Sequence, residues 1–356
     1  MFLFLGLPSA IGSWPPGEKI NLAEDYQPYV LEHFSGYLTI DEIYDGPFCI
    51  LYATDPKQGR RIAYQILESH PLETDINQFC HNLRVLLDQR GLAVFGVTTD
   101  GSPLYTATIP QNFLGARHQI CVFHILKELN KVVSRILARH RRELKARLGE
   151  KGGRGRPKNS ENLKVRQQKK QEKYITALFE SRTLWVKRQL TEAEQKRLKK
   201  LSRGQPLLRA LRELLETVYA LFDKRCRTET ARRKLSKLQK WHLFKRYPQL
   251  EAIRQKLEHP NLEKALEFLD DELLEKTSNA VERSNRRHRK MQKSIYRVRT
   301  RPTLDGRIKL DMMRDLSLIE RVKVVNVLHG LRLQEREEIV KEQTVCDSSK
   351  LQKEAG

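Results

Sequence analysis

The stretch YLTIDEIYDGPFCILYATD, residues 37–55, decides the fold class, because it predicts two adjoining β-strands. Its first half is rich in β-branched and aromatic residues and ends in Asp45-Gly46, a turn signal. Its second half is an apolar and aromatic run, and a third such run, RRIAYQIL (residues 60–67), follows a short polar turn. Three short strands separated by turn signals predict an antiparallel meander.

Helix and strand patterns alternate after the meander. Apolar residues at helical spacing predict a helix over residues 73–90. The apolar run LAVFGVTTD (residues 92–100) predicts a buried strand that ends in Asp100. A turn or short helix at 103–114 leads to a fifth predicted strand, ARHQICVFH (116–124). The predicted order is β-β-β-α-β-α-β, which indicates an α/β fold with a five-stranded sheet.

Residues 125–276 have the character of long helices. Helices are expected at 125–148, 171–190, 191–202, 206–240, 248–258 and 261–275. Residues 149–170 lack apolar periodicity and carry a strong excess of Lys and Arg, which predicts a flexible basic segment. A further helix-like pattern covers residues 305–328.

The charge balance points to a polyanionic partner. The chain has 356 residues, with 67 Lys and Arg against 44 Asp and Glu, a net charge of +23. Nucleic acid is the first expectation and an anionic membrane surface the second. No apolar run approaches the roughly 20 residues that span a bilayer, and the apolar start, residues 1–7, lacks the basic region of a signal peptide. Five scattered cysteines favour a reduced, cytoplasmic compartment over a disulfide scaffold.

Two acids stand out by their position on the predicted strands. Asp41 interrupts the apolar pattern of the first strand, and Asp100 ends the fourth. In a sheet of this order the first and fourth strands can be neighbours, which brings the two acids together. A third acid, Glu282, is the only one in the basic stretch TSNAVERSNRRHRKMQK (277–293). If this stretch is a helix, Asn285, Arg286, Arg289 and Lys293 share one face with Glu282.

Such a cluster of carboxylates has a chemical use. Converging carboxylates repel one another unless cations neutralise them, and Mg²⁺ prefers carboxylate and phosphate oxygens. Two ions about 3.5–4 Å apart can activate a hydroxyl and stabilise the leaving oxygen of a phosphoryl displacement. We therefore expect Mg²⁺, with Mn²⁺ as the alternative, at Asp41, Asp100 and Glu282. The alternatives are surface acids, turn chemistry at Asp45 and Asp100, and a solvated basic helix.

The segments YLTIDEIYDGPFCILYATD, VFGVTTDGSPLY, HQICVFHILKEL and TSNAVERSNRRHRK, in this order, resemble bacterial DDE transposases of insertion sequences. The resemblance is to those with an RNase H-like catalytic core interrupted by an all-helical insertion, a group that includes the Mutator-like elements. It implies a catalytic triad of Asp41, Asp100 and Glu282. It covers about residues 37–130 and 277–325.

The resemblance implies a division of the chain. Residues 37–124 and 277–325 would form the two parts of the core, on either side of a helical insertion at 125–276 with its basic linker at 149–170. Residues 326–356 would form a C-terminal tail. Residues 1–36 show no clear periodic core and are expected to be an extension or the remnant of an upstream DNA-binding module, since family members usually carry one.

Three further motifs each have more than one interpretation. Cys121 and His124 match a Cys/His pair of such families, and we favour a structural role at a strand-to-helix junction over zinc binding, with a phosphate contact by His124 as another alternative. Arg154 and Arg156 lie in a segment that resembles an AT-hook, which binds the minor groove, although a general phosphate-binding linker is the simpler reading. Trp185 and Trp241 are expected in the insertion core, with base stacking as the alternative.

The leading hypothesis is a DDE transposase that cleaves and transfers DNA strands. Asn285, Arg286, Arg289 and Lys293 would position the phosphate backbone of double-stranded DNA. A homo-oligomer on DNA, associated with the nucleoid in a bacterial cytoplasm, is the expected assembly. The alternatives are an inactive DNA-binding remnant and a structure-selective nuclease on the same fold.

Overall fold

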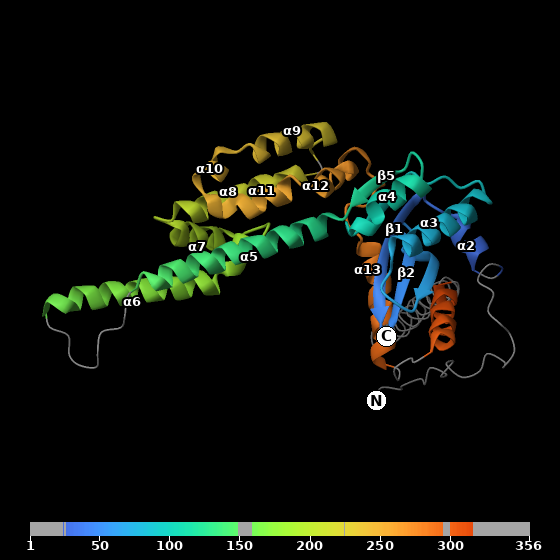
Figure 1. Ribbon diagram of the computed structural model, residues 1–356, viewed down its shortest axis with the longest axis horizontal. Helices are drawn as coiled ribbons and strands as arrows, with labels where there is room; N and C mark the ends of the chain where they lie inside the picture. Colours follow the sequence, from blue (N-terminus) through green and yellow to red (C-terminus); the bar gives the residue numbers. More distant parts are fainter. Residues whose placement is uncertain (1–23, 25, 149–158, 224, 295–299, 316–356) are drawn as a thin grey trace, which may run out of the picture.

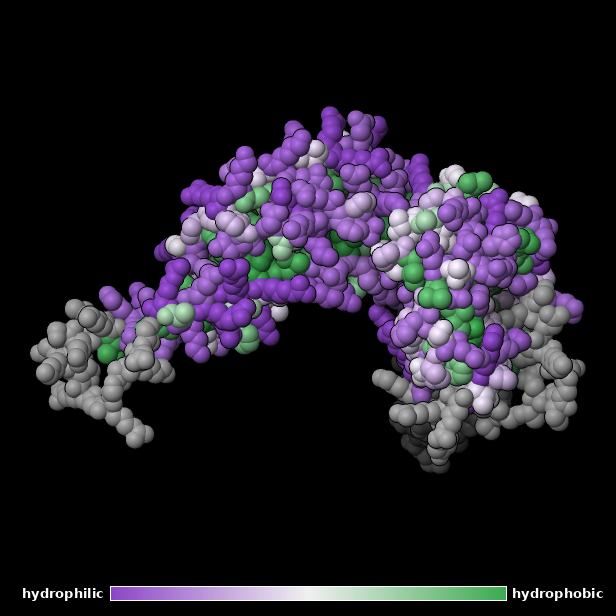
Figure 2. Space-filling model, in the orientation of Figure 1, coloured by the Kyte–Doolittle hydropathy of each residue, from purple (hydrophilic) through white to green (hydrophobic). Residues whose placement is uncertain are grey.

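The computed structural model describes residues 24, 26–148, 159–223, 225–294 and 300–315, which form a sheet-containing core and a long helical arm (Figure 1). Each part has its own cluster of buried apolar side chains. The two parts together form an arch with a broad concavity on one side, and its visible surface is mostly hydrophilic (Figure 2). Within the described ranges, no helix is both long and apolar enough to cross a membrane.

The core sheet has five strands in the order β3-β2-β1-β4-β5. Their bounds are β1 Tyr37–Asp45, β2 Phe48–Asp55, β3 Arg60–Leu67, β4 Gly96–Thr99 and β5 Arg117–Ile120. The first three strands pair antiparallel, which confirms the predicted meander, and β1–β4 and β4–β5 pair parallel. The first and fourth strands are neighbours, as the sequence pattern predicted. This mixed α/β sheet is RNase H-like.

Helices cover both faces of the sheet. α3 (Glu73–Asp88) and α4 (Pro103–Asn112) pack together on one face. α13 (Asn279–Ser294) and the helical residues 301–315 lie on the other. Every residue of β2 is buried, because β2 lies inside the sheet and both its faces are covered. This explains why its sequence is an apolar run without alternation.

A short helix before the sheet also belongs to the core. α2 (Gln27–Glu32) buries Val30 and Leu31, and the Tyr26 hydroxyl donates a hydrogen bond to the Arg61 carbonyl at 2.8 Å. This part of the segment 1–36, in which the sequence shows no clear periodic core, therefore packs against the sheet core. The helix is too short to show a periodic pattern in the sequence.

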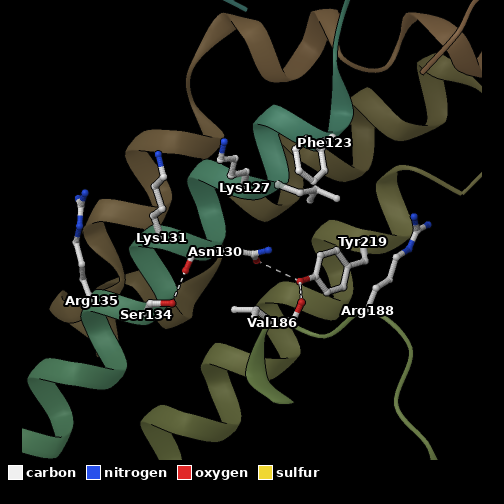
Figure 3. Close-up of a pocket in the computed structure, with 10 residues that line it drawn as sticks. Phe123, Lys127, Asn130, Lys131, Ser134, Arg135, Val186, Arg188 and Tyr219 are labelled. Carbon is white, nitrogen blue, oxygen red and sulfur yellow. Dashed lines mark hydrogen bonds between the residues drawn. The ribbon is translucent and has the colours of Figure 1, made fainter. Parts of the chain in front are cut away.

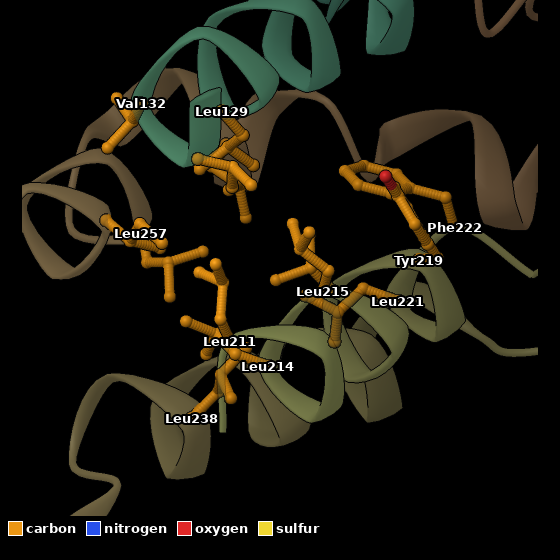
Figure 4. Close-up of a cluster of buried hydrophobic side chains, with 14 of the residues drawn as sticks. Leu129, Val132, Leu211, Leu214, Leu215, Tyr219, Leu221, Phe222, Leu238 and Leu257 are labelled. Carbon is orange, nitrogen blue, oxygen red and sulfur yellow. The ribbon is translucent and has the colours of Figure 1, made fainter. Parts of the chain in front are cut away.

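The insertion is helical throughout its described length. Its helices are α5 Val122–Ala146, α6 Asn159–Glu180, α7 Glu192–Ser202, α8 Pro206–Leu221, α9 Thr228–Gln239, α10 His242–Arg246, α11 Glu251–Leu257 and α12 Pro260–Lys264. Leucines of α5, α8, α9 and α11 meet in its centre (Figure 4). Trp185 is fully buried and Trp241 packs against the same cluster, which rules out base stacking by Trp185 in this conformation.

Two predictions for the insertion were wrong. The helix expected at 206–240 is two helices, since α8 ends at Leu221 and α9 begins at Thr228. The segment 149–170 was expected to be flexible, yet α6 begins at Asn159. Its Lys, Gln, Glu and Arg residues are good helix formers even without an apolar stripe. Residues 149–158, with Arg154 and Arg156, lie outside the described residues.

Candidate metal centre and active site

The geometry of β1 and β4 brings Asp41 and Asp100 together. The two strands pair in parallel up to Thr39 and Thr98, and continuing this register places Asp41 beside Asp100. β4 ends at Thr99, whereas β1 runs on to Asp45, so the edge of β1 next to these acids has no strand beside it. Side chains near Asp41 can therefore turn toward the end of β4.

The third carboxylate in this cluster is Glu42. Carboxylate oxygens of Asp41, Glu42 and Asp100 all lie within 4.8 Å of one another. Sequence reasoning missed Glu42, because neighbouring residues of a strand point to opposite faces and only one was expected to face the site. Two successive acids in an otherwise apolar strand were the available signal. Glu282 is not in this cluster.

Hydrogen bonds hold the acids in place. The Tyr105 hydroxyl on α4 donates to Glu42 Oε2 at 2.6 Å, and the Ser102 backbone N–H donates to Asp100 Oδ1 at 2.8 Å. On the opposite face, Asn285 Nδ2 on α13 donates to Asp41 Oδ2 at 3.0 Å. The cluster is therefore fixed from both faces of the sheet.

The cluster is electrostatically costly without a cation. Burial, followed by repulsion from Glu42 and Asp100, raises the pKa of Asp41 to about 8. Burial also raises the pKa of Glu42, against the lowering effect of the Tyr105 hydroxyl. Three clustered carboxylates are hard oxygen donors of the kind that Mg²⁺ and Mn²⁺ prefer, so the residues fit a divalent metal.

Asn285 has a different position from the predicted one. It was expected to contact the DNA backbone, but it is only 3% exposed and bonds to Asp41. Its Oδ1 is buried and has no hydrogen-bond partner among the described residues. Asn285 therefore belongs to the acid site, and its free acceptor is a further oxygen in that site. It does not share an exposed face with the arginines, as the helical spacing had suggested.

Glu282 lies on α13, between Ser278 and Asn285. Its N–H donates to the Ser278 carbonyl at 2.9 Å, one turn before it, and Asn285 follows one turn after it. The side chain is half-buried. Glu282 thus lies on α13 one turn before Asn285, which contacts Asp41, while its carboxylate stays outside the 4.8 Å group.

The other predicted DNA-binding residues are only partly described. Arg286 and Arg289 are exposed on α13. Lys293 belongs to the same helix, but its side chain lies outside the described residues, as do Arg154 and Arg156.

Cys121 caps α5 at the junction with β5. Its Sγ accepts hydrogen bonds from the backbone N–H and the hydroxyl of Ser278, both at 3.4 Å. Burial raises the pKa of Cys121, but hydrogen bonding by His124 and Ser278 outweighs this effect and lowers it. The thiol, and then the charges of Asp100 and Asp41, raise the pKa of His124. Among the described residues the pair belongs to no metal-ligand group, and its contacts favour the structural role.

The end of the insertion returns along the edge of the sheet and contacts the loop that carries Asp100. Asn261 Nδ2 donates to the Gly101 carbonyl at 2.8 Å, and Thr98 Oγ1 donates to the Glu275 carbonyl at 2.9 Å. Gly101 has φ +93°, and a Cβ there would lie 2.9 Å from Ile120, so glycine is required at this turn. The insertion therefore helps to position Asp100.

Comparison with known proteins identifies the family of the chain. A family model described as Transposase, DDE_Tnp_ISL3, matches residues 72–304, well over half of the chain. The matched range includes Asp100 and Glu282 and begins after Asp41 and Glu42. No curated protein matches the chain significantly. The Mutator-like group is a different family from this one, and the match does not confirm it. The chain belongs to the DDE_Tnp_ISL3 family of insertion-sequence transposases and acts in DNA transposition.

Proposed function

We propose that this transposase cleaves DNA strands and joins them to target DNA at the β1–β4 acid cluster. The proposal rests on one observation: the carboxylates of Asp41, Glu42 and Asp100 lie within 4.8 Å of one another. Acids this close to one another favour a bound cation or a retained proton, and the family implies divalent-metal chemistry on DNA. Asp41, Asp100 and Glu282 would hold Mg²⁺, and Mn²⁺ would substitute for it.

The reaction would proceed in two phosphoryl displacements. Water first attacks a phosphodiester at the element end, and the bond to the 3′-oxygen breaks, which leaves a 3′-hydroxyl. This hydroxyl then attacks a phosphodiester of the target DNA and displaces its 3′-oxygen. A divalent metal held by the acids would supply the Lewis acidity. Asn285 holds the Asp41 carboxylate in orientation, and Arg286 and Arg289 contact the phosphate backbone from α13.

Glu42 and Glu282 compete for the role of third acid. Glu42 has the shorter approach to the other two acids, but its carboxylate is already bound by Tyr105 on the far face of the sheet. Glu282 lies on α13, the helix that contacts Asp41. We assign the catalytic role to Glu282 and an electrostatic role to Glu42. The charge of Glu42 adds to the repulsion between the carboxylates, which a bound metal would relieve.

The experiment measures Mg²⁺-dependent cutting and joining of labelled DNA that carries the ends of the parent element. We expect Asp41→Asn, Asp100→Asn and Glu282→Gln each to reduce the rate of cutting. The reduction should exceed ~10–100-fold, which is the loss typical of a residue that only supports a metal ligand. Glu42→Gln should lose less than these three. Asp88→Asn, which removes an acid from the exposed surface of α3, is the matched control.

Two results would decide against parts of this assignment. If Asp100→Asn cuts as well as Asp88→Asn, the acid cluster is not the active site. If Glu42→Gln is inactive while Glu282→Gln is normal, the third acid is Glu42. Joined products separate a transposase from a nuclease that only cuts. We further propose that the active form is a homo-oligomer on double-stranded DNA, and cross-linking on element-end DNA would test this. In the cell, this form would be associated with the nucleoid in the cytoplasm.

A further inference from the structure

A groove on the helical insertion begins next to the acid site. It has a volume of about 690 Å³ and lies between α5, the segment after Trp185, and α8 (Figure 3). Tyr219 forms part of its floor, since its hydroxyl donates to the Val186 carbonyl at 2.7 Å. None of the residues that line the groove makes one of the described hydrogen bonds to Asp41 or Asp100, and the reaction above leaves the groove without a role.

Cations follow one side of the groove at regular intervals. Lys127, Lys131 and Arg135 are spaced four residues apart on α5, so they follow one another turn by turn (Figure 3). Arg188 lies across the groove. Lys131 pairs with Glu128 at 2.6 Å, whereas Lys127, Arg135 and Arg188 have no carboxylate partner within salt-bridge distance among the described residues. Four neighbouring cations with one acid favour a polyanion.

An exposed aromatic ring stands at the end of the groove nearest the acids. Phe123 is 51% exposed although it is large and apolar, and Lys127 lies 6.0 Å from its ring centroid. The next residue, His124, is near enough to Asp100 and Asp41 for their charges to raise its pKa. An uncovered aromatic face beside a row of cations is the arrangement that binds unpaired nucleic acid, because the ring stacks on a base while the cations bind phosphates.

The row continues beyond the groove. A second, smaller hollow shares Ser134 with it and is lined by Arg141, Arg142 and Arg182. Phe179 is exposed there, with Arg141 and Arg182 over its ring at 4.4 and 4.3 Å. From Phe123 to Arg142 the helix rises about 28 Å, which is enough for a short run of nucleotides.

We propose that the groove along α5 holds an unpaired DNA strand that leaves the acid site, with Phe123 stacked on a base and Lys127, Lys131, Arg135 and Arg188 bound to phosphates. A duplex keeps its base faces stacked inside and would leave the Phe123 ring in water. The inference rests on the proposed function only for the identity of the polymer, DNA. It assigns to the insertion a strand-binding role in addition to its contact with Gly101.

Binding is measured with full-length protein in EDTA, so that cutting does not contribute. The probes are a fluorescent mixed-sequence single strand and the duplex of the same length, titrated at several salt concentrations. The variants are Phe123→Ala, and Lys127→Ala with Lys131→Ala. The matched control is Lys196→Ala with Lys200→Ala, two exposed lysines at the same spacing on α7. Thermal unfolding confirms that each variant is folded.

We expect Phe123→Ala to weaken single-strand binding about 5-fold or more, and Phe123→Trp to retain it. The double lysine variant should reduce the slope of log K against log salt by about 1.4, from two lost phosphate contacts. If both variants bind the single strand as the control does, the proposal is overturned. A loss confined to the duplex also overturns it.

Failure here is distinguishable from failure of the proposed catalysis. Asp100→Asn in EDTA should bind the single strand as the parent protein does, while it fails to cut in Mg²⁺. If the groove variants bind normally and Asp100→Asn is inactive, the proposed active site is supported and only the strand-binding role of the groove is overturned.

Discussion

The sheet core and the helical insertion bury different kinds of side chain. The core buries ionisable groups, including Arg61, Asp311 and His288, whereas the interior of the insertion is mostly leucine. Among the described residues, Arg212 is the one side chain of Lys, Arg, His, Asp or Glu that is buried in the helices of the insertion, and three backbone carbonyls accept hydrogen bonds from it. Buried charges therefore organise the core, where we propose that the chemistry occurs, and apolar packing holds the insertion together.

The buried charges of the core join segments that are far apart in the chain. Arg61 on β3 pairs with Asp311, which also accepts from Arg287 on α13 at 2.9 Å. Arg287 reaches Asp315 at 2.7 Å. His288 lies between Asp45 Oδ2 at 3.0 Å and the Tyr52 hydroxyl at 3.2 Å. These contacts fix α13, and hence Glu282, against the sheet.

The largest expected effect is the response of the metal-free core to pH. The folded protein keeps the proton on Asp41 up to a pKa of about 8, whereas the unfolded chain loses it near 3.8. The stability from this group is complete below pH 3.8 and is lost as pH rises to about 8, at up to ~1.4 kcal/mol per pH unit. We expect Asp41→Asn to flatten this dependence, measured by denaturant unfolding in EDTA. Mg²⁺ should oppose the loss, and an unchanged pH profile in Asp41→Asn would contradict the assigned pKa.

The second test removes one buried charge of the core. Asp311→Asn leaves Arg61, which is 1% exposed, without its anionic partner. We expect a loss of about 3–5 kcal/mol in the free energy of unfolding. Asp223→Asn, on an exposed pair in the insertion, should change stability little. Equal losses of stability from the two substitutions would contradict the view that buried charges stabilise the core more than exposed pairs stabilise the insertion.

The third test makes a cavity in the insertion. Leu214 is fully buried in the leucine cluster, and Leu214→Ala should cost about 3 kcal/mol. The loss should appear in the helical part of the unfolding transition, since the two clusters are separate. Leu273→Ala, at a site that is 53% exposed, serves as the control. A loss confined to the sheet would show that the insertion does not have a core of its own.

The smallest expected effect concerns the contact between the two regions. Asn261→Ala removes the hydrogen bond to the Gly101 carbonyl, next to Asp100. We expect a loss of about 1 kcal/mol in the free energy of unfolding and a drop in cutting rate of up to about 10-fold. DNA binding in EDTA should be unchanged. Asn77→Ala, which breaks an exposed hydrogen bond to Asn112 elsewhere in the core, is the control. An unchanged cutting rate would show that this contact of the insertion does not help to position Asp100.

Much of the fold follows from local patterns in the sequence. Three strands with turn signals predicted the meander, and the acid at the end of the fourth strand pointed to Asp41 as its neighbour, which the parallel register places beside it. These patterns are readable because strand propensity, turn chemistry and periodicity act over a few residues. The same reasoning failed for α6 and for the end of α8 at Leu221, where good helix formers and a local break leave no periodic signal.

The sequence by itself predicted the order of strands and helices along the core, the basic character of the chain and the approach of Asp41 to Asp100. Only the tertiary structure decided that Glu42 joins these aspartates, that Asn285 is buried on Asp41, and that Glu282 lies outside the closest group. The physical reason is that these contacts depend on where β4 ends and how α13 packs across the sheet. The packing of α13 depends on pairings between residues more than 200 positions apart, such as Asn285 with Asp41, which no local pattern reports.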